Sequence, residues 1–211
     1  RTIPHSTITK PAKLNDEEFA NIKKHPIHGR VIMRRLEDEF KETFGDRIDM
    51  DLVEAVVGGH HLRPDGRGYG VEMKQWEIPN LVWISGIADA YDAMATDRSY
   101  QSGKHPKEIL GILSSEKGRQ FNPEFVDVFS EIVLPYPVNS LVLLDDGAVG
   151  VVDAFDRGEE EFDLQVLASL TLKGAIDLLS APRGTYPSRK VKKDDIALGV
   201  RRVDEIESKL R

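Results

Sequence analysis

Histidines at three positions have the chemistry and the setting of a metal site. His25 precedes a proline, while His60 and His61 are adjacent and follow two glycines, Gly58 and Gly59. Neutral imidazole is the commonest side-chain ligand for metals in proteins. Adjacent residues on a helix point about 100° apart, so His60 and His61 cannot both be buried on one apolar face. Two interpretations stay open here: a ligand cluster that the glycines allow to come close, or a polar helix end.

The composition restricts what such a site can hold. The chain has no cysteine, which excludes disulfides and thiolate ligands. Any metal must therefore be bound by His, Asp and Glu, whose nitrogen and oxygen donors suit Mn, Fe, Mg or Zn. The 29 basic and 36 acidic residues give a net charge of −7, which argues against binding to duplex nucleic acid.

The same sequence carries no membrane or secretion signal. No apolar run reaches the length of a membrane span, and no signal peptide is visible. We therefore expect a cytoplasmic protein with no membrane contact from this segment. The first residue is Arg1 and not Met, so we expect the native protein to begin further upstream.

Helical signals dominate up to about residue 134 and decide where the histidines lie. Asn15 and Glu18 have the spacing of a capping box, which predicts a helix start. Pro26 fits the first turn of a second helix extending to Phe44, so His25 is expected at a helix junction. Further helices are predicted from Asp51 to the glycine pair, from Asn80 to Thr96, and onward from Pro106 and Pro123.

Strand signals replace the helical ones after residue 137. Residues 141–144 and 148–154 flank an Asp-Asp-Gly turn and predict a hairpin. Further strands are predicted over 161–170 and 175–179, before a basic, loop-like stretch at 182–193. The predicted fold class is mainly α, with a helical domain followed by a small C-terminal β module. The predicted domains are a helical domain at 1–135, a β module at 136–193, and a terminal helix or tail at 194–211.

The loop after the histidine pair resembles a known signature. Residues 60–70 match the HD-GYP pattern HHE-x-x-DG-x-GYP at both histidines, the Asp-Gly pair, the second glycine and the tyrosine. Two positions differ, because Leu62 stands where the family has Glu and Gly70 where it has Pro. Residues 24–29, 87–94, 96–100 and 120–123 resemble the family's K-H-P-x-x-G, A-D-x-x-D-A, T/S-D-R-P-Y and Q-F-D-P motifs.

The resemblance covers residues 3–133, with a weaker match for the β module, and it implies a function. Members of the family are metal-dependent phosphodiesterases that hydrolyse cyclic di-GMP to pGpG or GMP in bacterial signalling. The implied fold is an HD-domain-like helical bundle, and the implied cofactors are two or three divalent ions, Fe or Mn. The family's His-Asp pair would lie immediately before Arg1, so no catalytic residue is assigned within this chain.

The resemblance also assigns residues to the metal and to the substrate. The implied metal ligands are His25, His60, His61 and Asp89, although Asp92 lies three residues further on and competes with Asp89 for that role. The implied substrate-binding residues are Tyr69, Arg98, Asp65, Gly66 and Gly68. Structural alternatives exist for each of these. Tyr69 could anchor the loop by packing, Arg98 could pair with a neighbouring aspartate, and an Asp-Gly pair favours a tight turn.

A second class of function competes with the enzyme. The signature loop could bind cyclic di-GMP, or a partner such as a GGDEF-domain cyclase, without turnover. Leu62, Gly70 and Gln101 depart from the family pattern and favour this alternative. A hydrolase of another nucleotide is a third interpretation, against which the Gly-Tyr loop argues. The partners implied by the resemblance are cyclic di-GMP, GGDEF-domain proteins and a second copy of the chain in a homodimer.

Overall fold

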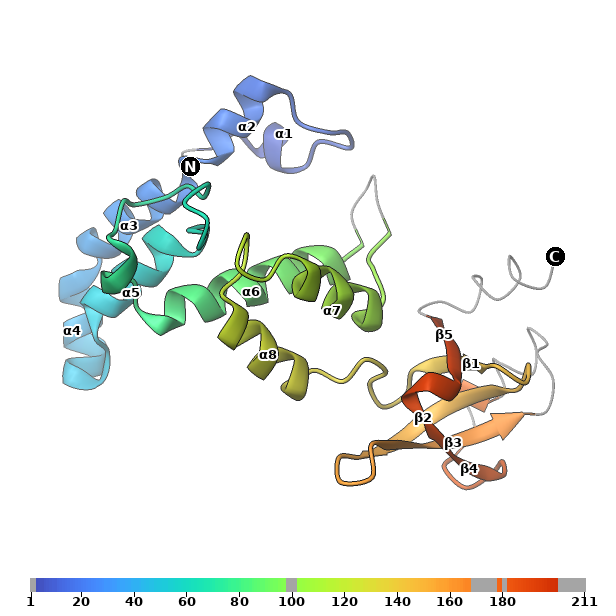
Figure 1. The fold of residues 1–211 in the computed structure, drawn as a ribbon. Helices are drawn as coiled ribbons and strands as arrows, with labels where there is room; N and C mark the ends of the chain where they lie inside the picture. Colours follow the sequence, from blue (N-terminus) through green and yellow to red (C-terminus); the bar gives the residue numbers. More distant parts are fainter. Residues whose placement is uncertain (1–2, 98–101, 168–177, 180–181, 201–211) are drawn as a thin grey trace. The chain divides into compact units, whose positions relative to one another are not determined.

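The chain folds into two compact units. The structure, a computed structural model, describes residues 3–97, 102–167, 178–179 and 182–200 (Figure 1). The first unit comprises Arg1–Lys104 and Ile109–Ile132, and the second comprises His105–Glu108 and Val133–Arg211. Helices make up the larger share of the described chain, and an antiparallel sheet forms a sizeable second part.

The helices largely follow the predicted pattern. The capping box at the start of α2 is present, because Glu18 N donates to Asn15 Oδ1 (2.8 Å) and Asn15 N donates to Glu18 Oε2 (2.8 Å). In the described residues the helices are α1 (His5–Ile8), α2 (Asp16–Ile22), α3 (His25–Arg35), α4 (Glu37–Phe44), α5 (Met50–Gly59), α6 (Asn80–Ala95), α7 (Pro106–Ser115) and α8 (Pro123–Ile132), with 3₁₀ turns at Gly45–Arg47, Gln75–Glu77 and Lys193–Asp195.

One predicted helix is interrupted. The prediction of a single helix from Pro26 to Phe44 is wrong, because the helix is interrupted at Leu36, where φ is −95° and ψ is 0°. The sequence offers a physical reason, because three acidic residues follow at 37–39 and favour the N-terminus of a new helix. His25 begins α3, with Pro26 in the first turn, so the predicted helix junction is confirmed.

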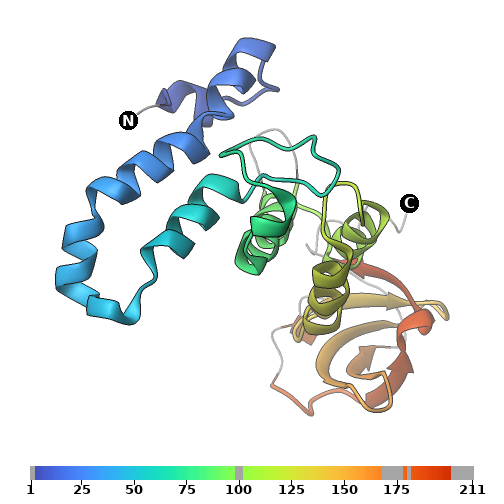
Figure 2. The same cartoon turned by 60° about the vertical axis from the view of Figure 1, so that its left-hand side comes forward.

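Helices α3 and α5 lie side by side (Figures 1 and 2), and the histidines lie at the start of α3 and just after the end of α5. A Cβ atom added at Gly29 of α3 would lie 2.6 Å from Val57 Cγ1 of α5, so the helices touch where a side chain is absent. Further along, the carboxylate of Glu54, which is only 8% exposed, accepts hydrogen bonds from Arg30 Nε (2.9 Å) and Arg34 Nε (2.7 Å). This ion pair network fixes α3 on α5.

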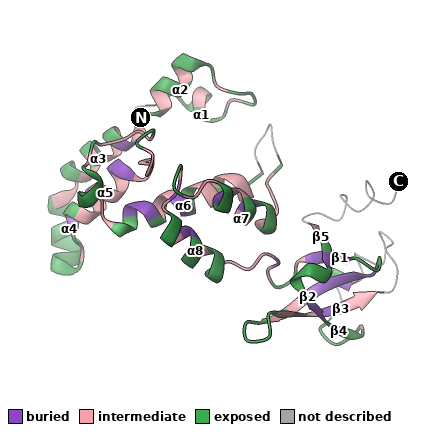
Figure 3. Ribbon diagram, viewed as in Figure 1, coloured by how far each residue is buried: buried purple, intermediate pink, exposed green. Residues whose placement is uncertain are grey.

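A second packed region of the first unit joins α6, α7 and α8. These helices bury an apolar cluster, seen as purple segments in Figure 3. Its fully or nearly fully buried members are Ile87, Ile109, Leu113, Phe121 and Val126. Because α6 also contributes Asp89, this cluster sets the position of the helix that faces the histidines.

The second unit contains a five-stranded antiparallel sheet. Its strands are β1 (Leu141–Leu144), β2 (Val149–Asp156), β3 (Glu161–Leu167), β4 (Ser188–Lys192) and β5 (Ile196–Val200), in the order β4-β3-β2-β1-β5. The predicted hairpin is confirmed, with Gly147 at φ +83° in its turn. The sheet covers a core that includes Tyr136, Val142, Val152, Phe162 and Leu164.

Two predictions for the C-terminal region are wrong. The stretch 182–193 was expected to be a loop, but it contains β4, in which only Val191 is buried. One apolar residue in five gives no alternation for a sequence pattern to detect. The terminal helix or tail predicted over 194–211 is replaced at its start by the end of a 3₁₀ turn and by β5, which pairs with β1. Residues 201–211, and 175–177 of the strand predicted over 175–179, lie outside the described residues.

Within the part of the chain that is described, no helix has both the length and the apolar character needed to cross a membrane.

Replacing Glu54 tests the ion pair network between α3 and α5. Burial alone would raise the pKa of Glu54, but the hydrogen bonds from Arg30 and Arg34 outweigh burial and lower it. We expect Glu54→Gln to reduce the free energy of unfolding by about 2 kcal/mol at neutral pH. Glu37→Gln, which removes an exposed pair with Lys41, should cost no more than about 0.5 kcal/mol.

The difference between wild type and Glu54→Gln should depend on pH. A carboxyl group whose folded pKa is lowered contributes stability above its unfolded pKa and loses it as the pH falls through the folded value. Urea unfolding across a series of acidic buffers should therefore show the free energies of unfolding of wild type and Glu54→Gln converging at pH values below the ordinary pKa range of carboxyl groups. A gap that stayed constant down to low pH would contradict the assignment.

Candidate metal centre

The fold brings the three histidines together. His25 is the first residue of α3, His60 follows the last residue of α5, and His61 comes next in the chain. His25 Nε2 lies 3.0 Å from His60 Nε2. One ring nitrogen from each of the three residues lies within 4.8 Å of the others, so these histidines have the geometry of a metal-ligand cluster among the described residues.

Backbone carbonyls orient two of these rings. His25 Nδ1 lies 2.9 Å from Ile22 O, and His60 Nδ1 lies 3.0 Å from Val57 O. A carbonyl oxygen can only accept, so each Nδ1 is assigned the proton and donates it. In the neutral rings, both Nε2 atoms then point lone pairs at each other across 3.0 Å.

Two facing lone pairs at that distance repel unless a cation lies between them. A neutral imidazole whose Nδ1–H is held by a carbonyl, leaving Nε2 as the donor atom, is the usual form of a metal-bound histidine. The donor set therefore fits a divalent metal ion.

His61 and Tyr69 form the adjacent wall. Their rings are stacked, with centroids 4.4 Å apart and an interplanar angle of 29°. Burial, reinforced by neighbouring His60 and His25, lowers the pKa of His61 to about 4, so this imidazole is neutral at physiological pH. Burial and the charge of Asp89 raise the pKa of Tyr69 to about 12, so its phenol keeps its proton.

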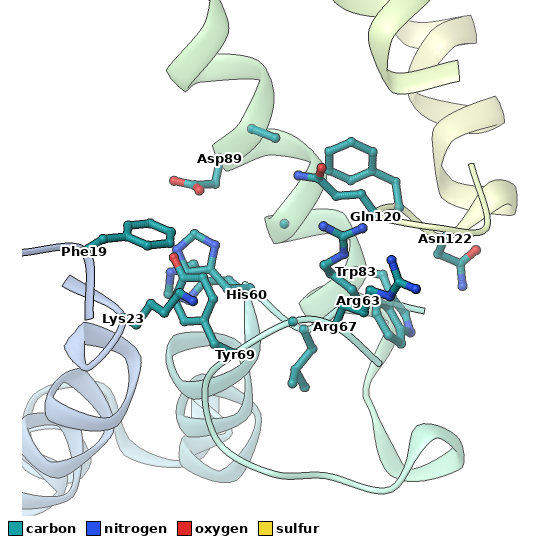
Figure 4. Close-up of a pocket in the computed structure, with 16 residues that line it drawn as sticks. Phe19, Lys23, His60, Arg63, Arg67, Tyr69, Trp83, Asp89, Gln120 and Asn122 are labelled. Carbon is teal, nitrogen blue, oxygen red and sulfur yellow. The ribbon is translucent and has the colours of Figure 1, made fainter. Parts of the chain in front are cut away.

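Asp89 faces the same pocket from α6 (Figure 4). Its charge acts on both His61 and Tyr69. Among the described residues, the cluster whose ligand atoms all lie within 4.8 Å of one another consists of the three histidines and does not include Asp89. The predicted ligand role of Asp89 stays a prediction.

Asp65 is engaged within the signature loop. Its carboxylate accepts hydrogen bonds from Arg63 Nε (3.0 Å) and Arg63 Nη2 (2.7 Å), and from the backbone N–H of Arg67 (3.0 Å). The hydrogen bonds from Arg63 are the main cause of the lowered pKa of Asp65. These contacts support the interpretation of the Asp-Gly pair as a turn, with Gly66 at φ +72°.

Close backbone approaches explain two loop glycines. A Cβ at Gly68 would lie 2.7 Å from Arg63 N and would collide with the carbonyl oxygen of His61. Gly70 has φ +130°, which proline cannot adopt, and a Cβ there would collide with the carbonyl oxygen of Gly58. The departure from the family's proline at Gly70 therefore has a backbone cause in this chain.

The pocket also contains residues to which the sequence assigned no role in the site. It has a volume of about 380 Å³ and is lined by His60, His61, Tyr69 and Asp89 together with Phe19, Lys23, Arg67 and Gln120 (Figure 4). Phe19 and Lys23 lie within two helical turns before His25, a spacing that could have placed them beside it. Arg98, the predicted phosphate-binding residue, and Gln101 lie outside the described residues.

Comparison with known proteins identifies the class. The model of the HD domain family matches residues 2–125. A cyclic di-GMP phosphodiesterase of Pseudomonas aeruginosa is 35% identical over 154 residues, which is 71% of this chain and 34% of that protein. A cyclic di-GMP phosphodiesterase of Thermotoga maritima is 32% identical over 130 residues, or 62% of this chain and 33% of that protein.

A third relative is named for a different messenger. A 3′3′-cGAMP-specific phosphodiesterase of Vibrio cholerae is 33% identical over 129 residues, or 61% of this chain and 23% of that protein. The chain thus spans about a third of the length of the first two relatives and 23% of the third. It belongs to the HD domain family, and the predicted resemblance to phosphodiesterases of this family is confirmed.

Removing one histidine of the cluster should remove bound metal. We expect protein purified with Fe or Mn to lose most of that metal in His60→Ala, because two of the three imidazoles cannot replace the missing donor. The control is His5→Ala, at an exposed histidine outside the cluster. Elemental analysis checks this, and equal metal content in both variants would refute the cluster as the binding site.

A methyl group at Gly70 should disturb the loop. Gly70→Ala places a Cβ at φ +130° against a carbonyl oxygen, and we expect a loss of roughly 3 kcal/mol in the free energy of unfolding. Gly111→Ala is the matched control, because a Cβ there meets nothing within 4 Å, and the change should stabilise the helix slightly. Unfolding by urea measures both, and equal stabilities would contradict the backbone argument.

Proposed function

We propose that the native-length protein hydrolyses cyclic di-GMP to linear pGpG, or to GMP after a second cut, as a cytoplasmic step of bacterial second-messenger signalling. The observation that carries this proposal is the 3.0 Å approach of His25 Nε2 and His60 Nε2, each ring held through Nδ1 by a backbone carbonyl. The relatives named as cyclic di-GMP phosphodiesterases support the choice of substrate.

The proposed cofactors are two or three divalent ions, Fe or Mn. His25, His60 and His61 would hold metal, with Asp89 as a carboxylate ligand from α6. When bound, such ions supply Lewis-acid stabilisation of charge on a phosphodiester and a nucleophile at neutral pH. The family's His-Asp pair, which the resemblance places before Arg1, would complete the set of ligands.

The chain's own side chains have separate tasks around the phosphodiester. His61 is neutral at physiological pH, since its pKa is lowered to about 4, so its ring can act as a ligand. Tyr69 is a hydrogen-bond donor and not a base, because its pKa is raised to about 12. Arg67 lines the pocket and can contribute positive charge near the phosphate oxygens, as we propose for Arg98.

A binding module is the second candidate function. Leu62, which stands where the family has Glu, lines the pocket with an apolar side chain, so the carboxylate that the family has at this position is replaced. Such a protein would bind cyclic di-GMP, or a partner such as a GGDEF-domain cyclase, without hydrolysing it. A homodimer is part of the proposal for the binding module and for the enzyme alike.

Turnover of cyclic di-GMP by the native-length, metal-loaded protein distinguishes the two candidates. We expect hydrolysis, detected by chromatography of pGpG and GMP, to fall by roughly 100-fold or more in His61→Ala and after chelation. His5→Ala should retain full activity. Binding without turnover in wild type would favour the receptor, and preferential hydrolysis of 3′3′-cGAMP in a side-by-side panel would reassign the substrate.

A further inference from the structure

Helix α2 and the residue that follows it present an aromatic and a basic side chain to the pocket. Phe19 is 46% exposed, and none of the residues of α2 is buried. Phe19 and Lys23 nevertheless both line the pocket that contains His60 and His61 (Figure 4). A ligand that covered this ring would remove its apolar surface from water, which is favourable.

Lys23 lies against two aromatic rings. Its Nζ lies 4.6 Å from the centroid of Phe19 and 5.7 Å from that of Tyr69. Among the described residues, no carboxylate forms an ion pair with Lys23. The ammonium group therefore keeps N–H donors for an anion while the ring faces stabilise its charge.

Phe19 is the more available of the two aromatic rings. Tyr69 is half-buried and already stacks on His61, with centroids 4.4 Å apart. Phe19 has a cation near its face and a large exposed area, which is the setting in which a nucleic-acid base can stack. The pocket volume of about 380 Å³ lies in the range of small-molecule sites.

We propose that Phe19 stacks on one purine of the cyclic dinucleotide and that Lys23 binds the phosphate next to that purine. Together they hold the substrate so that its other phosphodiester reaches the histidine cluster. Phe19 and Lys23 are thus substrate-binding residues that act on affinity and leave the metal ligands unchanged. This inference rests on the proposed function for the identity of the ligand, a purine cyclic dinucleotide.

The test uses the native-length, metal-loaded protein and five variants, of which the fifth, Phe19→Trp, is a rescue of the first. Phe19→Leu keeps an apolar side chain but removes the π face, and Lys23→Gln removes the charge. Phe44→Leu is the control for an exposed phenylalanine, 40% exposed on α4. Lys74→Gln is the control for a lysine over an aromatic ring, because Lys74 Nζ lies 5.6 Å from the Trp76 centroid and does not line the pocket.

The expected result is a separation of binding from chemistry. Phe19→Leu should raise KM and the equilibrium Kd for cyclic di-GMP roughly tenfold, with kcat, metal content and Tm close to wild type. Lys23→Gln should weaken binding and reduce its dependence on salt concentration. Phe19→Trp should restore affinity, whereas both control variants should behave as wild type. A purely structural Phe19 would instead lower Tm and leave Kd unchanged.

Direct binding keeps the two proposals distinguishable. If wild type binds cyclic di-GMP but does not hydrolyse it, the proposed enzyme function fails and the Kd comparison still tests Phe19 and Lys23. If wild type hydrolyses the messenger and the variants match it in KM and Kd, the inference fails while the enzyme stands. If wild type binds no purine cyclic dinucleotide at all, both are overturned.

Discussion

The approach of His25 and His60 is the constraint on which the rest of the first unit depends. Two Nε2 atoms 3.0 Å apart require α3 and α5 to be held side by side, because the residues are 35 positions apart in sequence. Gly29 allows the contact, and Glu54 with its two arginines fixes it. The interactions that stabilise the pairing of α3 with α5 therefore also set the geometry of the histidine cluster.

Backbone packing in the signature loop extends this constraint. Gly70 immediately precedes Val71, and because it has no side chain, Val71 N can donate a hydrogen bond to Gly58 O at 2.8 Å. The loop therefore returns to the end of α5 next to the histidines. Tyr69 N in turn donates to His61 O at 3.1 Å. These bonds place the Tyr69 ring on His61, and a side chain at Gly68 or Gly70 would push the loop away.

Local sequence signals predicted local structure well and tertiary placement less well. The capping box at Asn15 and the strand at 141–144 were predicted because their determinants lie within a few residues. The helix interruption at Leu36 is not predicted, because the mixture of apolar and charged residues typical of a helix continues across it. The histidines are found through their residue types and a motif. Phe19 and Lys23 are missed, because their spacing before His25 becomes a signal only once the fold shows that α2 lies beside the pocket.

Local charge, and not the net charge, decides which anion this chain can bind. The net charge of −7 disfavours long polyanions, which interact with the whole surface. Inside the pocket, Arg63 is neutralised by Asp65, whereas no ion pair is formed by Lys23 or Arg67 among the described residues. Divalent ions would add further positive charge that Asp89 offsets only in part. These local charges favour a compact anion that enters the pocket without contacting the rest of the surface.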